Sequence, residues 1–167
     1  MRKAVLALLC CGCLQGVPDN INCLGDDTCP TDYYCSDNNI CVALADGTPP
    51  ALVFNGVGTD PGAATGHQLN VPLTGLMFYV NVSNSGTHDA NSVSLSFDGP
   101  ACADLRTPDS VPAVPAGQGT VVGAMSNNPV LPCPDADYTA ILDVKQGNSL
   151  QPFHRVSSGT FRVHVGP

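Results

Sequence analysis

The cysteines of this chain are spaced regularly enough to suggest a chemical role, either metal binding or disulfide formation. Cys23, Cys29, Cys35 and Cys41 follow one another with five residues between neighbours. Cysteines can hold a zinc ion or oxidise to disulfides, and structural zinc sites usually bring their ligands in close pairs roughly two to four residues apart. The even spacing lacks such pairs, and turn-forming residues fill the gaps. We therefore expect two disulfides in an oxidising compartment, and no metal site.

The spacing of these four cysteines leaves their pairing open. Four cysteines allow three connectivities, and we favour the interleaved one, which joins the first to the third and the second to the fourth. A segment this small cannot hold itself together by apolar burial, so covalent bonds are expected to stabilise it. We therefore treat residues 23–44 as a small disulfide-rich module.

A further disulfide is expected between Cys102 and Cys133. Both cysteines lie in proline-rich segments that flank a predicted strand. The bond would close a loop of about 30 residues and contribute about 3–4 kcal/mol in the chain-entropy model. It would also hold two long loops together at one end of the domain. Long loops in a compact domain are often functional, so we predict the binding face at this end.

The N-terminus has the layout of an export signal. A basic start precedes the apolar run AVLALLCC, which is far too short for a transmembrane helix of roughly 20 residues. Cys13 follows the small residue Gly12. The segment resembles the signal of bacterial lipoproteins, in which a lipid-modified cysteine becomes the first mature residue. The resemblance implies a signal peptide over residues 1–12, a lipid on Cys13 and a tether over residues 13–22.

The count of cysteines agrees with a lipid on Cys13. Six cysteines then remain after it, and six can pair completely. The regular spacing and the run CPTDYYC also resemble the cysteine-rich repeats near the N-termini of exported bacterial lipoproteins, which implies a stalk or a binding knot. These resemblances imply attachment to a membrane through the lipid, at the outer membrane or cell surface. A periplasmic or secreted protein is the alternative.

The overall composition favours strands joined by turns. All fourteen acidic residues are Asp, Glu is absent, and Gly and Pro number 17 and 15. Glu and Lys are good helix formers, whereas Asp, Gly and Pro are not. The net charge is −8, and no cluster of Lys or Arg exists that could bind a phosphate backbone. Nucleic acid is therefore excluded as an expected partner.

The chain after a Gly- and Pro-containing linker at residues 45–50 reads as one β domain, residues 51–167. Segments with apolar residues at every second position predict half-buried strands. About seven such strands, with no helical periodicity, predict an all-β fold, an Ig-like antiparallel β-sandwich, with a β-barrel as the alternative. The predicted strands are residues 51–57, 68–73, 76–83, 91–98, 120–125, 138–145 and 159–165.

Part of this domain resembles a family of bacterial exported proteins. Val82, Asn84 and Gly86 match a "V-x-N-x-G" strand end, and residues 114–118 match a turn before the next strand. Both features are similar to those of the cell-adhesion-related Ig-like family called CARDB. The resemblance implies a binding or spacer module on an exported protein.

No motif of a catalytic site occurs in the sequence. The four histidines, His67, His88, His154 and His164, lack metal-ligand spacing, and Asp135 and Asp137 read as a solvated loop. We expect no catalytic residue, no cofactor and no metal, and hence no enzyme. The expected function is a binding or adhesion module for a protein or glycan on the cell surface. A structural subunit of an envelope assembly and a disulfide-rich inhibitor or effector are the alternatives.

Overall fold

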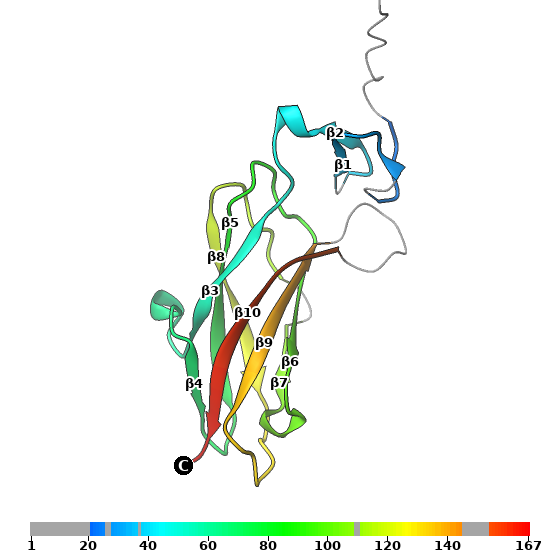
Figure 1. Cartoon of the computed structure of the whole chain (residues 1–167). Helices are drawn as coiled ribbons and strands as arrows, with labels where there is room; N and C mark the ends of the chain where they lie inside the picture. The colour runs from blue at the N-terminus through cyan, green and yellow to red at the C-terminus, as the bar shows by residue number, and fades with distance from the viewer. Residues whose placement is uncertain (1–20, 26–27, 37, 109–110, 145–153) are drawn as a thin grey trace, which may run out of the picture.

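The computed structural model contains a small N-terminal module and an elongated β-sandwich (Figure 1). The predicted signal peptide, the lipidation site Cys13 and nearly all of the tether lie outside the residues that the structure describes. Helices within the described residues are short 3-10 turns, and none is long and apolar enough to cross a membrane. The described residues are 21–25, 28–36, 38–108, 111–144 and 154–167.

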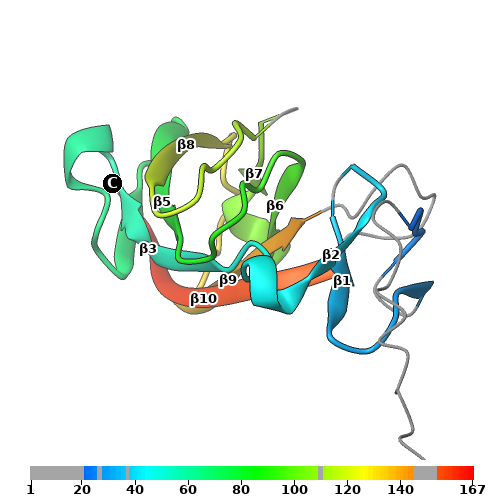
Figure 2. The same ribbon diagram turned by 90° about the horizontal axis from the view of Figure 1, so that it is seen from above.

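Two four-stranded sheets form the sandwich and lie face to face (Figure 2). One sheet has the strand order β3-β5-β8-β7, and the other has the order β4-β10-β9-β6. The connection from β5 to β6 therefore crosses from one sheet to the other. The strands are β3 Leu52–Gly58, β4 Gln68–Val71, β5 Leu76–Asn84, β6 Val93–Asp98, β7 Leu105–Arg106, β8 Gly119–Ser126, β9 Ala136–Val144 and β10 His154–Val165.

This strand order is that of an immunoglobulin-like sandwich. In immunoglobulin constant domains, strands A, B, E and D form one sheet, and strands C, F and G form the other. Here β3, β5, β8 and β7 take the first four places, and β6, β9 and β10 take the other three. The predicted all-β sandwich is therefore confirmed.

One strand pair departs from the predicted antiparallel arrangement. β4 pairs in parallel with β10, with Leu69 opposite Val163. β3 runs antiparallel to β5 in the first sheet, and after an intervening loop β4 continues in the direction of β3 within the second sheet. Because the chain changes sheets without reversing its direction, β4 cannot run antiparallel to β10.

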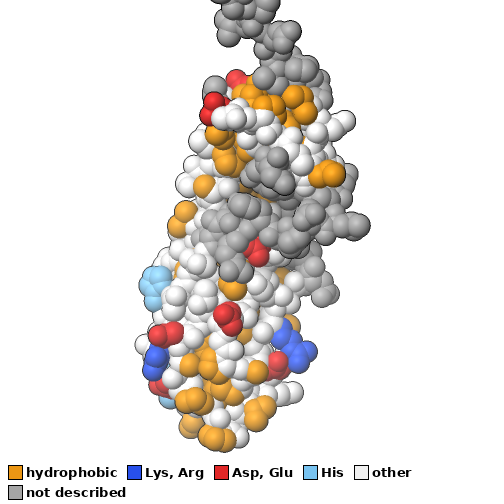
Figure 3. All heavy atoms as spheres, turned by 45° about the vertical axis from the view of Figure 1, so that its right-hand side comes forward, with side chains coloured by type: hydrophobic (Ala, Val, Ile, Leu, Met, Phe, Trp, Pro, Cys, Tyr) orange, Lys and Arg blue, Asp and Glu red, His pale blue; other side chains and the backbone are white. Residues whose placement is uncertain are grey.

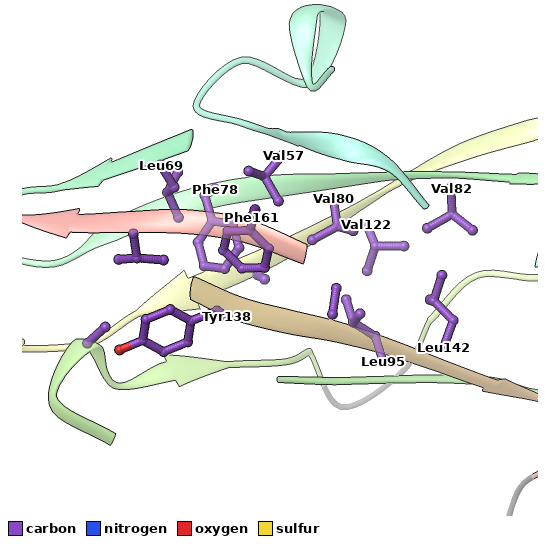
Figure 4. Close-up of a cluster of buried hydrophobic side chains, with 14 of the residues drawn as sticks. Val57, Leu69, Phe78, Val80, Val82, Leu95, Val122, Tyr138, Leu142 and Phe161 are labelled. Carbon is purple, nitrogen blue, oxygen red and sulfur yellow. The ribbon is translucent and has the colours of Figure 1, made fainter. Parts of the chain in front are cut away.

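Alternate residues of the long strands fill the space between the sheets (Figure 4). Phe78, Val80 and Val82 of β5 are fully buried and meet Leu142 of β9 and Phe161 of β10 in one cluster. Their neighbours in sequence face outward, which is the period-two pattern on which these strands were predicted. Burial of each such side chain contributes about 1.5–3 kcal/mol, so this cluster is the main apolar contribution to the fold.

The shortest strands were not predicted. β1 (Tyr33–Cys35), β2 (Cys41–Ala43) and β7 (Leu105–Arg106) have two or three residues each, too few for an alternating pattern to be recognised. β10 also begins at His154, earlier than the predicted start at residue 159, and its pairing with β9 is irregular near this end.

The N-terminal module is a two-stranded hairpin held by two disulfides. Disulfides join Cys23 to Cys35 and Cys29 to Cys41, which is the interleaved arrangement. In the hairpin Cys35 lies directly opposite Cys41, so the two bonds meet at the same strand pair. The small core of the module consists mainly of these cysteines, with few apolar side chains around them. Covalent bonds therefore take the place of an apolar core here.

The module begins earlier than its predicted boundary at Cys23. The N–H of Cys41 donates to the carbonyl of Ile21 at 2.8 Å, and Asn22 forms a β-bridge with Ile40. Ile21 and Asn22, which were assigned to the tether, are thus part of the module. Backbone pairing of this kind has no hydrophobic signature in a sequence, so the boundary could not be seen there.

The predicted linker is held against the sandwich by hydrogen bonds to the loop between β5 and β6. The N–H of Thr48 donates to Oγ1 of Thr87 at 2.7 Å, and the N–H of Thr87 donates to the carbonyl of Thr48 at 3.3 Å. Nδ1 of His88 lies 3.0 Å from the same carbonyl. The His88 ring also packs edge-on against Tyr34 of the module, with the ring centres 5.4 Å apart. The linker is therefore a docked segment.

A buried asparagine joins this loop to the rest of the domain. The Asn84 side chain is 2% exposed, and its amide group makes four hydrogen bonds. Nδ2 donates to the carbonyls of His88 and Val114 at 2.8 and 3.0 Å. Oδ1 accepts from the N–H groups of Ala51 and Gly86 at 3.0 and 2.9 Å. All hydrogen-bonding capacity of the amide is thus used to join three segments of chain.

Steric contact explains why residue 86, two positions after Asn84, is a glycine. A Cβ on Gly86 would overlap the carbonyl oxygen of Pro49, so this loop can approach the linker only where no side chain is present. The "V-x-N-x-G" pattern therefore has a structural explanation in this chain: Val82 is buried in the core, Asn84 joins the loops, and Gly86 allows the close approach.

We predict that Asn84→Ala lowers the free energy of unfolding by about 3–5 kcal/mol, because it leaves buried donors and acceptors without partners. Asn84→Asp should cost at least as much, since a carboxylate keeps both acceptors but places a charge beside two carbonyl oxygens. Urea unfolding measures both changes. The control is Asn81→Ala on the outer face of β5, expected to cost about 1 kcal/mol or less. Equal losses for Asn84→Ala and Asn81→Ala would contradict this role.

Candidate functional site

Exposed apolar side chains gather at the end of the sandwich that lies away from the module. Five of the eight exposed large apolar residues of the described chain lie at this end, and we call them the apolar tip; their exposure ranges from 40% for Leu73 to 64% for Val130. Figure 3 shows hydrophobic side chains gathered at this end, with charged groups around them. Contiguous apolar surface of this kind marks an interaction site more often than scattered residues do. The apolar tip consists of Leu73, Met77, Met125, Val130 and Leu131.

The turn between β4 and β5 presents Leu73. The N–H of Gly75 donates to the carbonyl of Pro72 at 3.1 Å, and Gly75 has a φ of +81°, which favours glycine. A Cβ on Gly75 would lie 2.6 Å from the carbonyl oxygen of Ser126, so the turn packs directly on the end of β8. This contact places Leu73 beside the loop that carries Val130.

The disulfide between Cys102 and Cys133 fixes the other two loops. It joins the segment after β6 to the segment before β9, and the two cysteines are 31 positions apart in the sequence. The N–H of Val130 also donates to the carbonyl of Cys102 at 2.8 Å. This is the disulfide and the end of the domain predicted from the sequence, and it holds exposed Val130 and Leu131 on a loop tied at both ends.

Buried polar contacts reinforce the same two loops from below. Oγ of Ser126, a buried hydroxyl, donates to the carbonyl of Ala103 at 2.6 Å. The phenol of Tyr138, at the start of β9, donates to the carbonyl of Pro100. Burial raises the pKa of Tyr138, and a backbone hydrogen bond at Ala103 opposes part of that rise. The phenol therefore stays protonated at neutral pH and remains a donor.

Charged pairs surround the apolar tip. Arg106 lies 3.1 Å from Asp104 beside β7, and Arg162 lies 3.2 Å from Asp137 on the outer face of β9 and β10. Exposed pairs of this kind contribute little to stability, typically about 0.2–1 kcal/mol. An apolar centre with a polar edge is, however, the usual composition of a protein–protein interface.

The structure also places the other residues considered in the sequence. Nδ1 of His164 lies 2.6 Å from Asp135, so each carboxylate of the pair Asp135 and Asp137 faces a side chain of β10. His67 packs beside Phe54, with ring centres 6.1 Å apart, and its carbonyl accepts from the N–H of Arg162 at 2.7 Å. The structure does not bring these histidines together into one site.

One group of cysteines has the spacing of metal ligands. The sulfur atoms of Cys23, Cys29 and Cys41 lie within 4.8 Å of one another. Each of the three is bonded in a disulfide, and only a thiolate binds zinc well. Their closeness therefore reflects two disulfides crossing the same hairpin.

Sequence reasoning found the location of the tip but none of its five residues. The signal available was an apolar residue inside a turn: Leu73 lies between Pro72 and Gly75, and Val130 and Leu131 lie between prolines. Met77 and Met125 could not be found in this way, because they belong to strands in which exposure depends on the neighbouring loops.

We predict that replacing Cys102 and Cys133 together by alanine lowers the free energy of unfolding by about 3–4 kcal/mol, because the unfolded chain regains the freedom of the open loop. Urea unfolding without reductant measures the loss while the two module disulfides stay intact. Limited proteolysis should then cut within residues 99–104 or 127–135, where the wild type resists. An unchanged midpoint together with unchanged protection would contradict this role of the disulfide.

Comparison with known proteins gives no independent assignment. No protein-family model matches the chain, and a search of curated proteins finds no match. The function is therefore argued from the geometry of the tip.

Proposed function

We propose that this protein is an exported, non-catalytic binding module that holds a protein partner on its apolar tip. The observation that carries the proposal is the tip itself: Leu73, Met77, Met125, Val130 and Leu131 are exposed on loops and strand ends that a disulfide and buried hydrogen bonds hold in place. Leaving this much apolar surface in water is costly, and a partner that covers it recovers that free energy.

The chemistry of the tip favours a protein over a glycan or an anionic surface. Its side chains are aliphatic or thioether groups, whereas sugar and base recognition relies on aromatic faces, and the chain has no Trp. The net charge of −8 opposes binding to phosphate-rich surfaces. A partner with its own apolar patch and a polar edge fits the charged pairs that surround the tip.

Export and anchoring are part of the same proposal. Three disulfides join six cysteines, which supports an oxidising compartment. The cysteine-rich module lies at one end of the sandwich and the loops of the tip lie at the other (Figure 1). With a lipid on Cys13, the docked module would lie between the anchor and the sandwich, and the tip would face away from the membrane.

We predict that replacing Val130 and Leu131 together by aspartate weakens binding of the purified, labelled protein to gene-deleted cells of the producing species at least tenfold. Two carboxylates would then have to be buried against an apolar partner surface. The measurement is a saturable binding isotherm.

The matched control replaces Ser158 and Thr160 by aspartate, which adds the same charge to the exposed outer face of β10. This control should bind like the wild type. Wild-type affinity in the tip variant, or an equal loss in the control, would contradict the proposal. If the wild type binds protein-free lipid vesicles and the tip variant does not, the partner of the tip is a membrane and the protein partner is ruled out.

A further inference from the structure

The two methionines of the tip lie directly opposite each other on neighbouring strands. Met77 of β5 pairs in register with Met125 of β8, and both side chains point to the outer face of their sheet. Side chains opposite each other in an antiparallel pair are only about 4.5–5.5 Å apart at Cβ. The two thioethers therefore occupy one continuous part of the apolar tip.

A glycine gives the first methionine its place on the surface. Sδ of Met77 lies 3.6 Å from the position that a Cβ on Gly123 would take, and Cε1 of Tyr79 lies 3.9 Å from the same position. Met77 thus lies across β8 at Gly123, next to Met125 on the same face. Met77 remains 49% exposed and Met125 45% exposed, so both residues are open to a small oxidant in solution.

Within the described residues, these two thioethers are the only sulfur atoms that are not part of a disulfide. All six cysteines of the described residues are bonded in disulfides, and the third methionine of the sequence, Met1, lies outside those residues. Within the described residues, the two exposed thioethers are therefore the sulfur atoms most open to oxidation. Oxidation of methionine converts an apolar side chain into a polar one.

We propose that Met77 and Met125 form a paired sulfoxidation site that weakens binding at the apolar tip. At each residue hydrogen peroxide transfers one oxygen atom to the thioether sulfur, which is oxidised to a sulfoxide, and the peroxide is reduced to water. Two polar S=O groups then lie side by side in the centre of the patch, where a partner surface would have to desolvate them. The effect on binding rests on the proposed function, whereas the modification itself does not.

The test treats the folded protein with hydrogen peroxide and follows intact mass, peptide masses and retention on a phenyl-substituted column. We expect a gain of roughly 16 Da at each of Met77 and Met125. We also expect earlier elution from the phenyl column, at a higher salt concentration of the falling gradient, because a less apolar tip is retained less. Methionine sulfoxide reductases should restore the original mass and retention. Methionines that stay unmodified at peroxide concentrations that oxidise a short methionine peptide would overturn the site.

The matched control replaces both methionines by leucine, which keeps an apolar side chain that peroxide cannot oxidise. In the cell-binding assay we expect peroxide to weaken wild-type binding at least tenfold and to leave the Met77→Leu, Met125→Leu variant unchanged. Glutamine at both positions should weaken binding without peroxide. Equal peroxide sensitivity of the leucine variant, or full wild-type binding after complete oxidation, would overturn the inference. The proposed function fails separately, if aspartate at Val130 and Leu131 leaves binding intact.

Discussion

The buried amide of Asn84 is the interaction on which the arrangement of this protein depends. Its four hydrogen bonds join the start of β3, the loop after β5 and the loop before β8. The loop after β5 in turn contacts the linker through Thr87 and His88, and the His88 ring packs against Tyr34 of the cysteine-rich module. The amide therefore acts on the placement of the module through His88, whose carbonyl it binds and whose ring packs against Tyr34.

The two ends of the sandwich are stabilised by different physical means. A hydrogen-bonded side chain orders the loops at the module end, whereas a disulfide, a buried hydroxyl and a buried phenol order the loops at the tip. The continuous core between them transmits this order, since closely packed side chains leave little room for the sheets to slide. Exposed apolar groups at the tip are thus held in fixed positions, which lowers the entropy lost when a partner binds.

The sequence predicted the parts of this structure that depend on local pattern. β5, β9 and the end of β10 follow from alternating apolar residues, and even spacing of cysteines led to the disulfide module. The parallel pairing of β4, the two-residue strand β7 and the docking of the linker depend on contacts between distant segments, so no local pattern reports them. Met77 and Met125 of the apolar tip were missed for the same reason, since the exposure of these strand residues depends on the neighbouring loops.

The most direct test of the account is site-specific photo-crosslinking in the producing cells, with a photoreactive residue at Leu131 in one variant and at Thr160 in another. Leu131 lies in the apolar tip, and Thr160 lies on the exposed outer face of β10. The account predicts a discrete protein adduct from position 131 and none from position 160. Adducts of equal yield from both positions, or an adduct from position 160 alone, would contradict the claim that the tip is the binding surface.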